Sequence, residues 1–138
     1  MKKGIKYLSV AGSLALAVSL FNCKDDVTGD GGSPSNVVFP TDSVSYIRHV
    51  QPLFNQTCAL SGCHDDGQNQ SALKLTNWAN TMNSAGAGIV IAGDPQNSLL
   101  IIRVEGRVGA RMPLNRNPLN QNQITGLRTW IAEGAGPQ

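Results

Sequence analysis

The sequence predicts an all-α domain with long loops, and two observations support this. Three segments carry apolar residues at helical spacing, whereas no segment alternates apolar and polar residues as a half-buried strand does. The chain between these segments is rich in glycine and asparagine. At 138 residues it suits one domain with a short appendage, and aromatic residues make up only 5% of it. A buried cofactor would supply the missing apolar bulk, as metals and disulfides do in other small domains.

The first expected helix covers residues 43–54, with Asp42 or Ser43 as its N-cap. Pro52 interrupts the pattern because it has no backbone N–H to donate, so the last turn is expected to be irregular. The apolar face of this helix consists of residues at helical spacing, namely Val44, Ile47, Val50, Leu53 and Phe54.

The second expected helix covers residues 95–104. Its apolar run Leu99–Ile102 would by itself also suit a strand. We decide for a helix because Asp94 resembles an N-cap and Pro95 follows at the first helical position, where a missing N–H costs nothing.

The third expected helix covers residues 121–133. Asn120 can cap it, Gln123 stands at the capping-box position, and Gly134 suits its end. A weaker helical pattern covers residues 77–83.

Residues 1–22 have the pattern of a secretory signal peptide. Lys2, Lys3 and Lys6 precede an apolar run of fifteen residues, Tyr7 to Phe21, which is shorter than the ~20 residues that a bilayer-spanning helix needs. A short uncleaved anchor helix is the alternative. Without this segment the chain has eight basic and nine acidic residues and no basic cluster, so its charge gives no indication of nucleic-acid binding.

The apolar run leads into the sequence Leu20 to Cys23, which resembles the lipobox of bacterial lipoproteins. The resemblance implies that Cys23 becomes the lipidated first residue of an exported protein, held at a bacterial membrane and facing the periplasm or the cell exterior. Residues 24–35 have almost no apolar side chains, so we assign residues 23–41 to the lipidated N-terminus and a flexible tether. The folded domain is expected to cover residues 42–138.

Cys58, Cys63 and His64 bring two thiols and an imidazole together within seven residues. A disulfide is one interpretation in an exported protein, but it leaves His64 unexplained. A zinc site is another, but structural zinc needs four ligands and His49 is the only other histidine. Covalent haem explains all three residues, because each thiol can bind a porphyrin vinyl group and the adjacent imidazole then lies beneath the iron. The usual spacing is C-x-x-C-H, so the four intervening residues here have to bulge, which Gly62 makes easier.

This motif and the segments around it resemble a family of bacterial mono-haem cytochrome c domains with a C-x4-C-H site. The resemblance covers residues 44–135 and implies a small cytochrome c-like helical domain wrapped around one covalent haem c. The matching segments are Pro52-Leu53-Phe54, Cys58 to Gly67, Leu73-Lys74-Leu75, Gly93 to Leu100, Met112-Pro113 and Trp130 to Ala135.

The resemblance also implies that Met112 is the distal ligand of the iron, opposite the proximal His64. A thioether is a soft, uncharged ligand that favours ferrous iron and raises the reduction potential. Met82 and His49 are the competing distal ligands, and an ordinary packing role for Met112 is the alternative.

Two further residues are candidate haem contacts. Arg111 can pair with a propionate, although it equally suits a solvated loop. Trp130 can pack on the haem or on the first helix.

The expected function is electron transfer by a membrane-anchored mono-haem cytochrome, with redox proteins as donor and acceptor and no enzymatic reaction. Two protein ligands would saturate the iron and leave no open position for a substrate. The alternatives are a haem peroxidase or gas-binding protein with an open distal site, and a non-haem lipoprotein with a Cys58–Cys63 disulfide.

Overall fold

The computed structural model describes residues 35–67 and 71–138, and this part of the chain is helical with no strand. The predicted all-α class is therefore confirmed. The elements are a π-helical segment η1 (Tyr46–Val50), α1 (Gln51–Thr57), α2 (Trp78–Asn83), α3 (Leu99–Glu105) and α4 (Gln121–Ala132).

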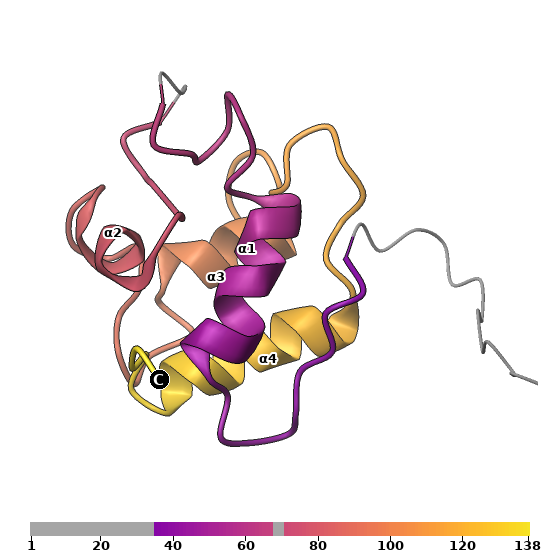
Figure 1. The fold of residues 1–138 in the computed structure, drawn as a ribbon, viewed down its shortest axis with the longest axis vertical. Helices are drawn as coiled ribbons and strands as arrows, with labels where there is room; N and C mark the ends of the chain where they lie inside the picture. The colour runs from indigo at the N-terminus through magenta and orange to yellow at the C-terminus, as the bar shows by residue number, and fades with distance from the viewer. Residues whose placement is uncertain (1–34, 68–70) are drawn as a thin grey trace, which may run out of the picture.

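The helices cross around one small core (Figure 1). η1 and α1 form a continuous rod, α4 crosses it near its N-terminal half, and α3 packs against α4. The loops that follow α1 and α3 both lie beyond the C-terminal end of α1, whereas α2 lies at the periphery. The largest fully buried apolar side chains are Trp130, Phe54, Leu53, Leu75, Ile101, Leu127, Ile131, Val50 and Val104.

The first helix begins later than the sequence predicts, and its irregular turn precedes Pro52 instead of following it. Ser45 is the N-cap, its side chain accepting a hydrogen bond from Arg48 N, and Gln51 N donates to the carbonyl of Tyr46 five residues back. A regular α-helix would press the Pro52 ring against the Arg48 carbonyl. The wider π turn relieves this clash, so the helix continues to Thr57.

The π turn also rotates the apolar face. Ile47, predicted to be buried, is 69% exposed, and Tyr46 is buried in its place. The Tyr46 hydroxyl lies 2.8 Å from Thr81 Oγ1 and donates to Gln51 Oε1 at 2.7 Å. Burial raises the pKa of this phenol to about 12.

The second helix starts at Leu99 and not at Pro95. The Asp94 carboxylate accepts from Asn97 N at 3.1 Å and from its side-chain amide at 2.6 Å, which stabilises a turn in place of a first helical turn. Ser98 then occupies the N-cap position and donates through its hydroxyl to the Asp94 carbonyl at 2.8 Å.

The other two helices agree closely with the sequence prediction. α4 starts at Gln121 with the predicted capping box between Asn120 and Gln123, and it ends at Ala132, one residue early. α2 starts at Trp78, with the Asn77 side chain as its N-cap.

Residues 35–39, which the sequence analysis places in the tether, lie against α4 as part of the fold. Phe39 is buried, and the Asn122 side chain accepts from its N–H at 2.8 Å and donates to its carbonyl at 3.0 Å. Gln123 Nε2 donates to the Ser35 carbonyl at 3.0 Å. The domain therefore extends N-terminal to residue 42, because these polar side chains hold the preceding segment on the helix.

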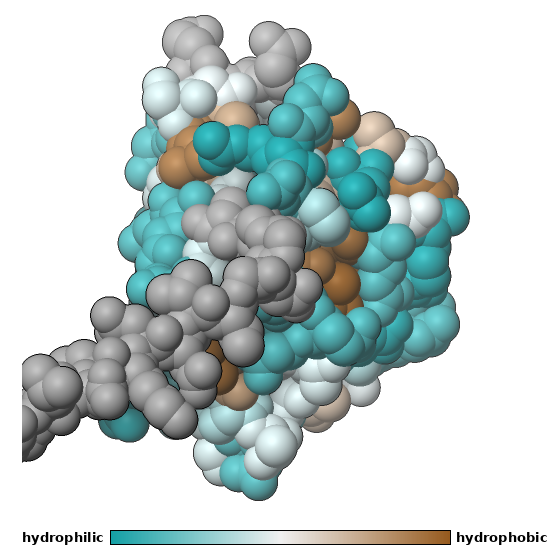
Figure 2. All heavy atoms as spheres, turned by 90° about the vertical axis from the view of Figure 1, so that its right-hand side faces the viewer, coloured by the Kyte–Doolittle hydropathy of each residue, from teal (hydrophilic) through white to brown (hydrophobic). Residues whose placement is uncertain are grey.

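The predicted signal peptide and Cys23 lie outside the described residues. Within residues 35–67 and 71–138, no helix has the length and apolar character needed to cross a bilayer. Figure 2 shows that the described residues on the face at the right of Figure 1 are mostly hydrophilic, with small hydrophobic patches between them.

We expect Gly126→Ala to lower the free energy of unfolding by about 1–3 kcal/mol, because the added methyl group would collide with the Phe39 ring. Urea or thermal denaturation of the full chain measures this change. In a Phe39→Ala background the collision is gone, and the same substitution should be neutral or stabilising, since alanine is the better helix former. An equal loss in both backgrounds would contradict close packing of the ring on this glycine.

Candidate functional site

One cavity of about 420 Å³ gathers the four residues predicted to bind haem covalently or through its iron, although Met112 is far from the other three in the sequence. Cys58, Cys63, His64 and Met112 all line it. It lies between the C-terminal end of α1, one face of α3 and the loops that follow these two helices. Most of the remaining lining is aliphatic, so the cavity suits a flat apolar ligand with a few polar contacts.

Cys58 is positioned by α1, of which it is the C-cap. Its N–H donates to the Phe54 carbonyl at 2.8 Å, and its side chain is buried with Sγ 3.1 Å from Thr57 Oγ1. Burial raises the pKa of the Cys58 thiol to about 11, so the sulfur is a neutral thiol at physiological pH.

The loop from Cys58 to His64 closes on itself in spite of the longer spacing. His64 N donates to the Cys58 carbonyl at 3.1 Å, and Cys63 N donates to the Leu60 carbonyl at 2.8 Å. Gly62 has a φ of 76°, a left-handed conformation that glycine adopts without strain. The left-handed turn at Gly62 therefore accommodates the longer spacing, while both thiols and the imidazole remain at the cavity.

The His64 ring is oriented by the segment that leads to α2. Its Nδ1 lies 3.1 Å from the Leu73 carbonyl, and Leu75 N donates to the His64 carbonyl at 2.9 Å. Because a carbonyl oxygen only accepts, Nδ1 carries the proton and Nε2 presents a lone pair. This is the tautomer and the kind of outer-shell hydrogen bond that metal-binding histidines have.

Met112 approaches from the loop after α3. It is half-buried, its N–H donates to the Arg103 carbonyl at 2.9 Å, and the following Pro113 is buried. The two arginines that line the cavity are Arg103 and Arg116. Arg111 does not line it, and its exposed side chain lies beside Gly106.

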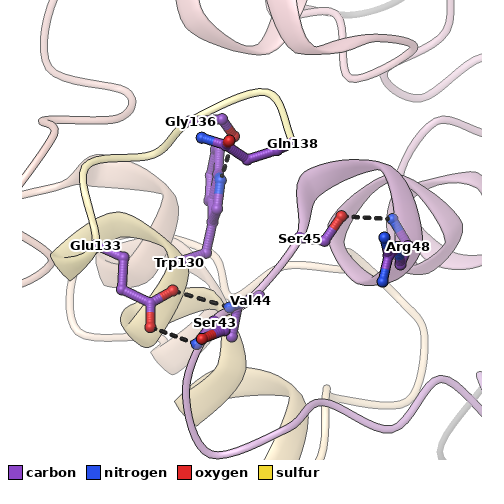
Figure 3. Close-up of a pocket in the computed structure, with 8 residues that line it drawn as sticks. All are labelled: Ser43, Val44, Ser45, Arg48, Trp130, Glu133, Gly136 and Gln138. Carbon is purple, nitrogen blue, oxygen red and sulfur yellow. Dashed lines mark hydrogen bonds between the residues drawn. The ribbon is translucent and has the colours of Figure 1, made fainter.

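Trp130 lies outside this cavity and packs in the core, with its ring centroid 5.4 Å from that of Tyr46 on the first helix. Its indole Nε1 donates to the Gly136 carbonyl at 2.9 Å. It lines a different pocket of about 400 Å³, in which Glu133 accepts hydrogen bonds from Ser43 N and Val44 N (Figure 3). Of the two roles the sequence left open, packing on the first helix is the one observed.

The two competing distal ligands also lie elsewhere. His49 Nδ1 accepts from Ser45 N at 3.0 Å, and its ring centroid lies 5.9 Å from that of Phe39. Met82 packs against the core from α2. Neither lines the cavity, so Met112 is the one of the three candidates that meets His64 there.

Sequence reasoning missed Arg103 and Arg116. Arg103 follows the apolar run of α3 and, at helical spacing, shares a face with the cavity-lining Leu100 and Val104. Extending that periodicity by one turn would have found it. For Arg116, in an irregular loop, the sequence contains no such signal.

The described residues assemble no site for a metal held by side chains alone. Within this part of the chain no three histidine, cysteine, aspartate or glutamate side chains converge on one point, and Cys58 and Cys63 are free thiols. Four-ligand zinc is therefore not supported. Haem iron needs only axial protein ligands, because the porphyrin supplies the other four.

A comparison of the chain with known proteins finds no matching family model, no similar curated protein and no similar solved structure.

We expect the two thiols to differ sharply in reactivity when the full chain is produced without haem attachment. Iodoacetamide should modify exposed Cys63 first, because at pH 8 a thiol of pKa about 11 is thiolate in only roughly one molecule in a thousand. The rate at Cys58 should keep rising towards pH 11. Peptide mass spectrometry measures both rates, and urea should make them similar. Equal rates in native buffer would contradict the burial of Cys58.

Proposed function

We propose that this protein is a mono-haem c-type cytochrome that carries single electrons at a membrane surface. The observation that supports this most directly is the shared cavity of Cys58, Cys63, His64 and Met112. Cys58, Cys63 and His64 lie close together in the sequence, but Met112 reaches the cavity only through the fold. The family resemblance implies Met112 as the distal ligand without any use of this geometry.

The donor set and the walls of the cavity fit haem c. Two thiols can form thioethers, His64 Nε2 is available as a proximal ligand, and the Met112 sulfur is a soft distal ligand. The volume of about 420 Å³ falls within the usual range for cofactor sites, and Leu73, Leu75 and their neighbours supply an apolar wall. Haem bound here would supply one-electron chemistry by cycling between ferric and ferrous iron.

The residues of the chain have separate tasks in this proposal. Cys58 is held as a neutral thiol, and addition of its S–H across a haem vinyl group would leave an uncharged thioether at this buried position. The hydrogen bond from Nδ1 to Leu73 fixes the His64 ring. Arg116 takes over the pairing with a haem carboxylate that the sequence analysis considered for Arg111, because Arg116 lines the cavity and Arg111 does not.

An electron carrier is favoured over an enzyme because two protein ligands would close both axial positions of the iron. The apolar cavity and the Met112 thioether would both favour the ferrous state and raise the potential. Export and lipidation at Cys23 belong to the same proposal, and they rest on the N-terminal sequence. A lipid there would hold the domain at a membrane surface through the segment that docks on α4.

We expect the full chain, co-expressed with a c-haem maturation system, to gain the mass of one haem that survives acid–acetone extraction. Reduction with dithionite should give sharp α and β absorption bands. A Cys58→Ser/Cys63→Ser double variant should lose the haem on extraction. A colourless wild-type protein from a host that matures other c-type cytochromes would refute the proposal and leave a disulfide lipoprotein as the better account.

We expect Met112→Ala to keep the covalent haem but to open the sixth position, so that the ferrous protein binds carbon monoxide readily. Met82→Ala is the matched control, because Met82 does not line the cavity and its loss should leave the position closed. Carbon monoxide difference spectra measure both. Ready binding by the wild type, unchanged in Met112→Ala, would show that Met112 is not the ligand and would favour a gas-binding or peroxidase function.

A further inference from the structure

Both ends of the loop that carries Met112 are bonded to one carbonyl group. Gly106 N, at the start of the loop, donates to the Arg103 carbonyl at 3.2 Å, and Met112 N, at its end, donates to the same oxygen at 2.9 Å. The seven-residue segment from Gly106 to Met112 therefore closes on the last turn of α3. Where Met112 lies depends on how this loop is held against that turn.

The Arg103 side chain also contacts the middle of the loop. Its guanidinium Nη1 lies where it would be only 2.6 Å from a Cβ on Gly109, so a side chain at that position would have to displace the guanidinium. Gly109 has a φ of 66°, which disfavours other residues as well. One residue thus contacts the start, the middle and the end of the loop, and it lines the cavity beside Met112.

Within residues 35–67 and 71–138, no carboxylate forms an ion pair with this guanidinium. Glu105, the acidic residue nearest to it in the sequence, is bound by Arg107 and Arg128, each at 2.7 Å. The half-buried Arg103 side chain lies with its guanidinium beside Gly109 in the loop.

We propose that Arg103 is a positioning residue that keeps Met112 seated over the cavity and so keeps the sixth position of the iron closed. The inference rests on the proposed function, in which Met112 is the distal ligand. The backbone bonds hold the two ends of the loop, and the guanidinium supports its middle. Without that support, conformations with Met112 outside the cavity gain population, and the fraction of open sites rises.

The test uses the haem-loaded full chain and the variant Arg103→Gln. We expect about a tenfold faster binding of carbon monoxide to the ferrous protein and a weaker red-end charge-transfer band in the ferric protein. Arg103→Lys, which keeps the charge and much of the length, should restore part of the closure. Arg107→Gln removes the same charge from the same loop without touching Gly109 or the cavity lining, so it should retain the wild-type band.

A second variant keeps Arg103 but fills the space where it lies. Gly109→Ala should displace the guanidinium and accelerate carbon monoxide binding by a similar factor. Gly134→Ala is the matched control, since its φ of 99° imposes comparable backbone strain but its Cβ would meet nothing within 4 Å. The mass of covalent haem and a thermal melt show that each variant is folded and loaded.

The outcomes separate the two proposals. If Met112→Ala opens the site but Arg103→Gln and Gly109→Ala bind carbon monoxide as slowly as the wild type, the positioning role is wrong and the cytochrome assignment stands. If Arg107→Gln opens the site as much as Arg103→Gln, charge and not contact is responsible, and the positioning role is again wrong. If the wild type takes up no covalent haem, both proposals fail together.

Discussion

The backbone hydrogen bond from His64 N to the Cys58 carbonyl holds the candidate site together. Cys58 is fixed at the end of α1, and the bond returns the chain to that point after four intervening residues. The carbonyl of His64 and its Nδ1 are then tied to Leu75 and Leu73, which form part of the cavity wall. A longer spacing between the thiols is therefore compatible with a compact site, because the left-handed turn at Gly62 takes up the extra residues.

The buried aromatic side chains lie away from the cavity. Phe39, Tyr46, Phe54 and Trp130 are all buried, yet none of them lines the cavity. Tyr46 packs against Phe54 and Trp130, and Phe39 packs against Gly126 of α4, whereas the cavity is lined mostly by aliphatic side chains. An apolar hollow of this size is unfavourable in water, and a flat apolar cofactor would remove its surface from solvent.

Local signals in the sequence predicted α4 to within one residue, because a capping box such as Asn120–Gln123 is a short-range hydrogen-bonding pattern. The first helix was predicted less well. The effect of Pro52 appears one turn upstream as a π turn, which the 3.6-residue period does not contain, and so Ile47 was assigned to the wrong face. The thiols, the imidazole and the thioether were found through motifs. Arg103 was not, because its position depends on a loop folding back on α3.

Three arginines lie near the end of α3. Arg107 and Arg128 bind Glu105, whereas Arg103 lines the cavity. Glu105 accepts hydrogen bonds from Arg128 and Arg107, and that from Arg128 contributes most to keeping the pKa of this carboxyl below its usual value. The carboxylate thus stays ionised and links α3 to α4 while both of its oxygens are engaged. Arg103, two residues earlier, faces another side of the helix, and its guanidinium lies against Gly109. The helix that packs on α4 is therefore the same element that determines where the Met112 loop can lie.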